Sequence, residues 1–222
     1  ARFYPNCFVF RFATPAGDWI GASPERLAAV EDGRVRAASL AGSRRRGTTE
    51  QEDRVLAEGL LRDPKERAEH AVVVRAVREA LESACVDVQV PCEPQLMRMA
   101  NIQHLYTPVS GCLRPGLGVL DLVERMHPTP AVGGWPRDRA LAAIRELEQM
   151  DRGWYAGPVG WFDGDGNGEF AVALRTARVS AGVATLYGGA GIVAGSEPER
   201  ELAESALKMR PLADALGMKP WT

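Results

Sequence analysis

The rest of the chain is expected to be organised around a glycine-rich turn and an acidic helix near its end, Gly188-Gly-Ala-Gly-Ile-Val-Ala-Gly-Ser-Glu-Pro-Glu-Arg-Glu-Leu-Ala-Glu-Ser-Ala-Leu-Lys208. It follows the end of a predicted strand at Tyr187 and runs through glycines into a helix that we expect to open at Ser196. Ser196 and Glu199 have the spacing of a capping box, in which each side chain satisfies a free backbone N–H group of the other residue. Because glycines permit close backbone approach, the turn can hold amide N–H groups against an anion.

The helix in this stretch carries four charged residues on one face. Glu197, Glu201, Glu204 and Lys208 recur at steps of four, three and four, which is the spacing of neighbours on a helix surface. One interpretation is a solvated face on which Glu204 and Lys208 form an i,i+4 pair. The other is a divalent-metal site beside the anion-binding turn, since Mg²⁺ typically takes one or two carboxylates plus substrate oxygens. The charge pattern alone leaves both interpretations open.

The composition is that of an ordinary globular protein with one large or two small domains. The chain has 222 residues, of which 45% are apolar and 25% charged, and its formal net charge is −2 at pH 7. Neither nucleic acid nor an anionic membrane is therefore an expected partner. We expect a cytoplasmic protein, because no signal peptide opens the chain and no apolar run approaches the ~20 residues of a membrane span. Four cysteines lack zinc spacing and are predicted to be reduced, buried thiols: Cys7, Cys85, Cys92 and Cys112.

Alternation of apolar and polar residues predicts several strands joined by turns. Asp32-Gly33 lies between the apolar runs Leu27–Val30 and Val35–Leu40 and is a hairpin signal. A polar loop is expected after it, at Ala41–Gly47. Further strands are expected at Cys7–Phe12, Trp19–Ala22, Gln95–Ser110, Glu169–Val179 and Val183–Gly188.

Three further helices are predicted. The first covers Thr49–Leu61, and the second follows Asp63, a good N-cap, with Pro64 at its first position and an end near Cys85. The third covers Pro136–Asp151. Three of its apolar side chains are expected to point inward: Ala140, Ile144 and Leu147. Hairpins interleaved with four helices favour an α+β fold with a largely antiparallel sheet.

Glu69 stands out on the second of these helices. It shares a stripe with the apolar residues Val73, Ala76 and Ala80, at +4, +7 and +11. A buried carboxylate without a partner is costly. A carboxylate on an apolar stripe is therefore a stronger functional signal than one on a solvated face.

Three other motifs are weaker than they first look. Asp163–Gly168 begins like a calcium loop, but its twelfth position is Leu174 rather than Glu, so we expect a glycine-rich turn. Gly189–Ala194 resembles a dinucleotide fingerprint, but no further strand with an acidic residue fits before Thr222. The histidines lack the spacing of a zinc site: His70, His104 and His127.

Nine short motifs occur in order along the chain and together carry a family resemblance. They are Ser23-Pro-Glu-Arg-Leu27, Leu40-Ala-Gly-Ser-Arg44, Glu66-Arg-Ala-Glu-His70, Gln103-His-Leu105, His127-Pro-Thr-Pro-Ala131, Trp154-Tyr-Ala-Gly157, Leu174-Arg175, Gly189-Ala-Gly-Ile-Val193 and Glu201-x-x-Glu204-x-x-x-Lys208. Over essentially its whole length the chain resembles the chorismate-utilising enzymes: isochorismate, salicylate, anthranilate and aminodeoxychorismate synthases. The motifs are most similar to those of isochorismate synthases. The resemblance implies that residues 1–222 form a chorismate-binding domain with a fold like that of anthranilate synthase component I.

The resemblance also implies an activity. Isochorismate synthases are isomerases that add water at C2 of chorismate and expel the C4 hydroxyl, with Mg²⁺ on the ring carboxylate. Glu25 matches the family's acid, which protonates the leaving hydroxyl and needs a raised pKa. Glu69 and Glu204 match the metal ligands, with Glu66 and Glu201 as nearby or water-mediated partners. Chorismate is the implied small-molecule partner, in either menaquinone or siderophore biosynthesis.

A set of substrate-binding residues follows from the same resemblance. The set comprises Lys208, Arg175, Tyr155 and the amides of Gly189 and Gly191 for the substrate carboxylates, Gly42 and Ser43 near the C4 hydroxyl, and His104 near the ring carboxylate. Ala131 disfavours a salicylate synthase, because salicylate and anthranilate types usually carry Thr at that position.

One departure from the family concerns the general base. In the family it is a lysine upstream of the Ser-Pro-Glu motif, on a strand that would precede Ala1, and neither Lys65, Lys208 nor Lys219 matches it. The resemblance is therefore to a C-terminal portion, apparently truncated at its N-terminus. A polypeptide of these residues alone is expected to bind chorismate weakly with negligible turnover. The alternatives are a salicylate synthase or other chorismate-utilising enzyme, and an inactive fragment that lacks the base; the oligomeric state stays open.

Overall fold

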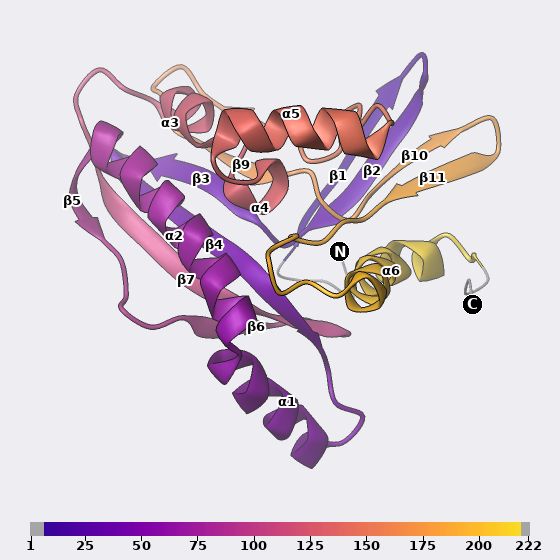
Figure 1. The fold of residues 1–222 in the computed structure, drawn as a ribbon. Helices are drawn as coiled ribbons and strands as arrows, with labels where there is room; N and C mark the ends of the chain where they lie inside the picture. Colours follow the sequence, from indigo (N-terminus) through magenta and orange to yellow (C-terminus); the bar gives the residue numbers. More distant parts are fainter. Residues whose placement is uncertain (1–6, 219–222) are drawn as a thin grey trace.

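The computed structural model describes residues 7–218, which form two sheets flanked by helices (Figure 1). The strands are β1 (Phe8–Thr14), β2 (Gly17–Ser23), β3 (Arg26–Glu31), β4 (Arg34–Arg45), β5 (Cys85–Gln89), β6 (Gln95–Arg98), β7 (Ile102–Leu113), β8 (Pro158–Phe162), β9 (Gly168–Val172), β10 (Thr176–Ser180) and β11 (Val183–Tyr187). The helices are α1 (Glu50–Arg62), α2 (Pro64–Ala84), α3 (Val119–Met126), α4 (Pro130–Gly133), α5 (Arg137–Glu148) and α6 (Pro198–Ala215).

The two sheets are both antiparallel. The smaller has the strand order β1-β2-β10-β11, and the larger has β5-β7-β4-β3-β9-β8 with β6 paired to β7. The predicted hairpin is present: β3 and β4 pair antiparallel around Asp32 and Gly33, both at positive φ. The α+β class and the largely antiparallel arrangement predicted from the sequence are confirmed.

Helix α2 packs along the larger sheet and supplies much of the core (Figure 1). It begins where predicted, because the Asp63 side chain accepts hydrogen bonds from the backbone N–H groups of Lys65 and Glu66. Burying an aliphatic side chain stabilises a fold by about 1.5–3 kcal/mol. The residues that α2 contributes to the core are Val73, Val77, Leu81 and Ala84.

The segment Ala41–Gly47 corrects one prediction. Instead of a polar loop it is largely strand, because β4 continues to Arg45 and pairs with β7 down to Ile102. The register shifts between Ala41 and Ser43, where Gly42 has φ +78°. A polar, arginine-rich sequence resembles a loop locally, whereas the long β7 strand beside it satisfies its backbone hydrogen bonds.

A second correction concerns the predicted strand Glu169–Val179. It is two strands in different sheets: β9 pairs with β3 and β8, and β10 pairs with β2 and β11. The break falls at Leu174-Arg175, where Arg175 has φ +50°. The chain therefore crosses from one sheet to the other at a buried arginine.

Helix α5 is the third correction. It forms close to the predicted range, but none of its residues is buried, and Leu147, expected to point inward, is 78% exposed. Its principal neighbour in the described part of the chain is the short α4. The apolar stripe of α5 therefore does not pack into the core.

The predicted capping box of α6 is also wrong. The helix begins at Pro198 with Glu197 as N-cap, and Glu197 makes no side-chain cap bond. Ser196 instead accepts a hydrogen bond from the Val193 N–H group within the preceding loop. Glu197 itself is exposed and ion-paired with Arg200 at 3.5 Å.

The sequence patterns missed β5, β8, α3 and α4, and they predicted the cysteines only in part. All four cysteines are free, as expected, but only Cys85 is buried; Cys7 is partly exposed, and Cys92 and Cys112 are exposed. Among the described residues no helix is long and apolar enough to cross a membrane.

Candidate active site

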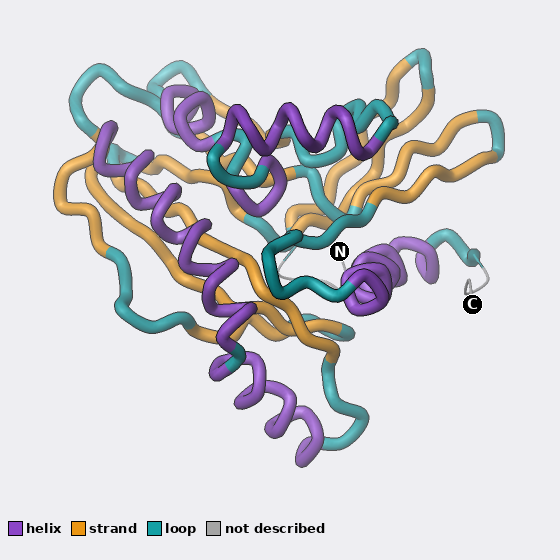
Figure 2. The backbone as a smooth tube through the Cα atoms, in the orientation of Figure 1, coloured by secondary structure: helices purple, strands orange, loops and turns teal. Residues whose placement is uncertain are grey.

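A cavity of about 520 Å³ lies between α2, the α4–α5 segment and the loop that joins β11 to α6. Figure 2 shows this loop running beside α2 before α6 begins. Most of the site residues predicted from the sequence line the cavity: Glu25, Gly42, Ser43, Glu69, His104, Ala131, Tyr155, Arg175, Gly189, Gly191 and Lys208. The other three predicted residues are not in the lining: Glu66 and Glu201 lie in the first turns of α2 and α6, and Glu204 lies in the second turn of α6, paired with the lining residue Lys208.

Glu25 lies between β2 and β3 and is 4% exposed. Its backbone is held at both ends, because its N–H group donates to Ser23 Oγ and its carbonyl accepts from the Val172 N–H group. Burial raises the pKa of Glu25 to about 7, against the opposing charges of Lys208 and Arg175. A neutral carboxyl is therefore available near neutral pH to donate a proton into the cavity.

Glu69 reaches the cavity from α2. Burial, followed by the charges of Glu66 and Glu204, raises the pKa of Glu69 to about 7. Its carboxylate lies directly against the backbone of Gly191, where an added Cβ would collide with it. The fold brings Glu69 within electrostatic reach of Glu204, from helices far apart in the sequence, with the backbone of Gly191 packed against the Glu69 carboxylate.

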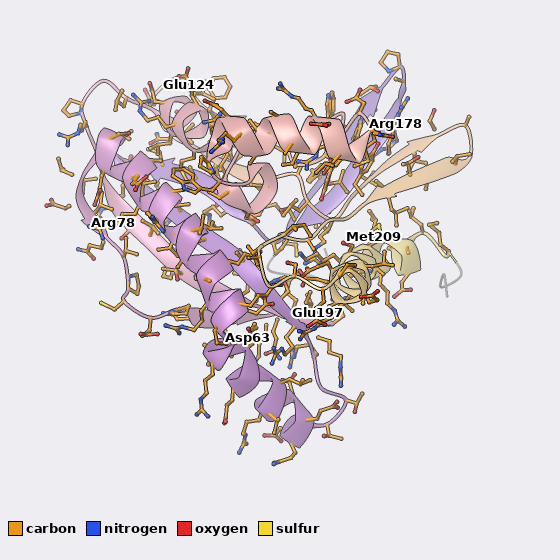
Figure 3. The ribbon with its side chains drawn as sticks, viewed as in Figure 1. Asp63, Arg78, Glu124, Arg178, Glu197 and Met209 are labelled. Carbon is orange, nitrogen blue, oxygen red and sulfur yellow. The ribbon has the colours of Figure 1, made fainter. Side chains whose placement is uncertain are left out.

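Two lysines face the carboxylates at the helix starts. Lys65 Nζ lies 2.8 Å from Glu201 Oε1 and 3.1 Å from Glu66 Oε1, and Lys208 Nζ lies 2.6 Å from Glu204 Oε1. The four charged residues on one face of α6 therefore do not share one environment. Glu201 and Glu204 turn inward, while Glu197, labelled in Figure 3 at the start of the helix, faces solvent.

Lys65 is a neighbour that sequence reasoning did not assign to the site. The only local signal was its place beside Glu66 in a chain with three lysines. Its contact with Glu201 joins positions 136 apart in the sequence, and no spacing rule predicts such a contact.

His104, Ser43 and Arg175 form a hydrogen-bonded chain at the bottom of the cavity. Arg175 donates to His104 Nε2 at 3.1 Å, and His104 Nδ1 lies 2.9 Å from Ser43 Oγ. Burial, followed by the charges of Arg175 and Lys208, lowers the pKa of His104 well below its usual value. A neutral imidazole that accepts at Nε2 carries its proton on Nδ1, so His104 donates to Ser43.

Tyr155 is held by a stack of aromatic rings. It stacks on Tyr187 at 5.3 Å between ring centroids, Tyr187 stacks on Trp19 at 5.5 Å, and Trp19 stacks on Trp154 at 5.9 Å. Burial raises the pKa of Tyr155, so its hydroxyl stays a hydrogen-bond donor beside Gly189. The stack fixes the direction in which that donor points.

The donor set fits Mg²⁺ better than a metal held wholly by protein. Within residues 7–218 no three His, Cys, Asp or Glu side chains are gathered in a metal-binding group. Mg²⁺ needs only one or two carboxylates when substrate and water complete its shell, and Glu69 and Glu204 supply two. The calcium-like loop is a turn, as expected, because Asp163 Oδ1 accepts from the N–H groups of Asp165 and Asn167.

Comparison with known proteins adds an independent finding. A family model described as chorismate binding enzyme matches residues 1–217. Isochorismate synthase MenF of Bacillus subtilis is 44% identical over 210 residues, 95% of this chain and 45% of that protein. The salicylate biosynthesis isochorismate synthase of Pseudomonas aeruginosa is 48% identical over 198 residues, 89% of this chain and 42% of that protein.

A solved structure shows the same likeness. The structure of MenF, the menaquinone-specific isochorismate synthase of Escherichia coli, matches with a TM-score of 0.87 and 34% identity. The match covers 97% of this chain and 50% of that one. The chain thus spans about half the length of the relatives it matches.

Proposed function

The chain belongs to the family of chorismate-binding enzymes, and from that premise we propose that the whole protein is an isochorismate synthase. It converts chorismate to isochorismate by adding water at C2 and losing the C4 hydroxyl as water. Two relatives named above, at 44% and 48% identity, are isochorismate synthases. The four free cysteines fit a reducing compartment, so we keep the cytoplasm as the proposed location.

One observation carries this proposal: Glu25 is a buried carboxyl with a pKa of about 7 in a cavity that also holds cationic groups. Loss of a hydroxyl requires an acid that is still protonated at working pH, and a carboxyl meets that requirement near pH 7 when desolvation raises its pKa. Glu25 protonates the C4 hydroxyl so that it departs as water.

Substrate binding falls to the cations and donors around the cavity. Chorismate carries two carboxylates, and Lys208, Arg175 and the Tyr155 hydroxyl supply positive charge and hydrogen bonds for them. His104, held neutral between Arg175 and Ser43, keeps the Ser43 hydroxyl oriented. The volume of about 520 Å³ falls within the usual range for small-molecule sites.

Glu69 and Glu204 are the residues that would hold Mg²⁺. Bound there, the ion would supply positive charge that fixes a substrate carboxylate. Glu66 and Glu201 keep their ion pairs with Lys65, so they would contact the ion only through bound water molecules.

The proton of the attacking water has to pass to a base. Lys65 and Lys208 are poor candidates, because each is already engaged in an ion pair with a glutamate. Lys219 lies outside the described residues. The family resemblance places the base on a lysine in the part of the relatives that precedes the matched region, and the proposal keeps it there.

The test is to incubate the whole protein with chorismate and Mg²⁺ and separate the products by chromatography. Isochorismate as the main product supports the proposal, and chelation of the metal should abolish its formation until Mg²⁺ is restored. Salicylate with pyruvate would make the protein a salicylate synthase instead. If the folded whole protein forms no product, the proposal is wrong and the protein is a chorismate-binding fold without catalytic activity.

A further inference from the structure

Lys65 lies between two buried carboxylates that belong to different helices. Its ammonium group is 2.8 Å from Glu201 Oε1 on α6 and 3.1 Å from Glu66 Oε1 on α2. Glu66 and Glu201 are each 7% exposed. Burial opposes the charged form of Lys65, but the hydrogen bonds to Glu201 and Glu66 outweigh it and raise the pKa of Lys65. Lys65 is therefore a cation at any physiological pH.

Lys65 changes how many oxygens the acidic cluster can offer to an ion. The cluster consists of four glutamates: Glu66, Glu69, Glu201 and Glu204. Lys65 takes one oxygen of Glu66 and one of Glu201, and the Ser43 N–H group donates to the second oxygen of Glu66 at 2.8 Å. Lys65 thus engages two of the four carboxylates, while Lys208 engages Glu204 separately.

Lys208 plays a different part, although it also pairs with a glutamate. It lines the cavity and donates to the Gly189 carbonyl as well as to Glu204. A substrate carboxylate in the cavity can draw Lys208 away from Glu204 and free that carboxylate. Lys65 does not line the cavity, so no substrate group competes for it.

We propose that Lys65 sets the metal specificity of the site, as a fixed counter-charge that keeps Glu66 and Glu201 out of the coordination shell. Two carboxylates, Glu69 and a Glu204 released by Lys208 to the substrate, suit Mg²⁺, which keeps several waters. Four free carboxylates would suit Ca²⁺, which takes six to eight oxygens in flexible geometry. The inference rests on the metal site of the proposed function and assigns Lys65 as a positioning residue for it.

The test is calorimetric titration of the whole protein with Mg²⁺ and, separately, with Ca²⁺, with and without chorismate. A site that has lost a positive charge binds both Mg²⁺ and Ca²⁺ more tightly, because less charge repels them. The readout is therefore the ratio of the Mg²⁺ Kd to the Ca²⁺ Kd, in which this general effect cancels. In Lys65→Met we expect that ratio to shift toward Ca²⁺ by about tenfold or more, since ligand charge count tunes Ca²⁺ affinity over decades. Lys65→Arg, which keeps the charge, should restore most of the wild-type ratio.

Arg67→Met is the matched control. It removes a positive charge two positions further along α2, from a residue that pairs with exposed Glu93 and not with the cluster. Its Kd ratio should equal that of the wild type. An unchanged ratio in Lys65→Met, or an equal shift in Arg67→Met, would overturn the inference and leave the proposed function intact. A wild-type protein that binds no Mg²⁺ even with chorismate would overturn both.

A second pair of variants keeps the inference testable if Lys65→Met does not fold. Glu201→Gln should weaken Mg²⁺ binding by less than about threefold, because Glu201 is committed to Lys65, whereas Glu204→Gln should weaken it by about tenfold or more. Equal losses in the two variants would contradict the assignment.

Discussion

The two walls of the cavity differ in what supports them. One wall is formed by α2, β4 and β7, whose side chains Val73, Val35 and Leu105 are at most 2% exposed. The other is formed by α4 and α5, and α5 buries no residue at all. Helices α2 and α5 each have an apolar stripe at helical spacing, but only the stripe of α2 packs into the core. An apolar stripe therefore predicts a helix, but it does not show whether another element packs against that helix.

The supported wall and the neighbouring strand ends carry the chemical groups. Glu69 lies on α2, Ser43 on β4 and His104 on β7, while Glu25 is held between β2 and β3. Groups on packed elements keep their geometry. The α5 wall offers the cavity mostly apolar side chains such as Ile144 and Leu147. Substitutions in the two walls should therefore have very different consequences.

The largest effect is expected from Glu25→Gln in the whole protein. The amide cannot donate the proton that the leaving hydroxyl needs, and loss of a positioned acid typically lowers kcat by about 10²–10⁴-fold. The KM for chorismate should change little, because Glu25 is not assigned to carboxylate binding. Steady-state kinetics measure both, and a variant with nearly normal kcat would remove Glu25 as the acid.

The next largest effect is expected from Leu81→Ala in the supported wall. Leu81 is fully buried on α2, and a Leu→Ala cavity costs about 2–5 kcal/mol in the free energy of unfolding. Denaturant titration followed by circular dichroism measures this loss. A cost below about 1 kcal/mol would mean that α2 is no better supported than α5.

A tenfold effect per pH unit is expected from the titration of Glu25. Because the acid must be protonated and its pKa is about 7, kcat should fall about tenfold per unit at higher pH. The raised pKa also favours the protonated folded state. Its stabilising contribution is therefore complete below the ordinary value of 4.5 and is lost as pH rises through about 7.

That titration has its own control. Between pH 5 and pH 8 the free energy of unfolding of the wild type should fall relative to that of Glu25→Gln, measured by denaturant titration at each pH. Parallel pH profiles in the two proteins would show that Glu25 does not titrate in this range.

A smaller effect is expected from Ala131→Thr on α4. The hydroxyl adds a polar group to the cavity wall at the position where salicylate and anthranilate types usually carry Thr, so some pyruvate should be released as a minor product. A coupled assay for pyruvate detects it against an Ala131→Ser comparison. Product ratios equal to those of the wild type would remove Ala131 as a determinant of reaction type.

The smallest effect is expected from Leu147→Ala on α5. Leu147 is 78% exposed, and exposed substitutions usually change the free energy of unfolding by less than about 0.5 kcal/mol. Denaturant titration beside Leu81→Ala gives the direct contrast between the walls. A loss above about 2 kcal/mol would show that α5 is packed in solution.

Several features of this protein could be predicted from the sequence because they depend on near neighbours. The start of α2 follows from Asp63 and Pro64, and the β3–β4 hairpin follows from Asp32-Gly33. Cap bonds and tight turns form between residues a few positions apart, so their signals are local. The ordered motifs indicated the family, and most of the residues they assigned line one cavity.

Other features were decided only by the tertiary structure. The path of β4 through Gly42, the division of Glu169–Val179 at Arg175 and the exposure of α5 all depend on which distant strand or helix lies alongside. The same is true of Lys65, whose partner Glu201 comes from the far end of the chain. Local propensity is a weak prior that long-range packing overrides. The sequence indicated most of the elements and the set of chemical groups through local patterns. The packing decided where strands continue or break, and which carboxylates are buried or ion-paired.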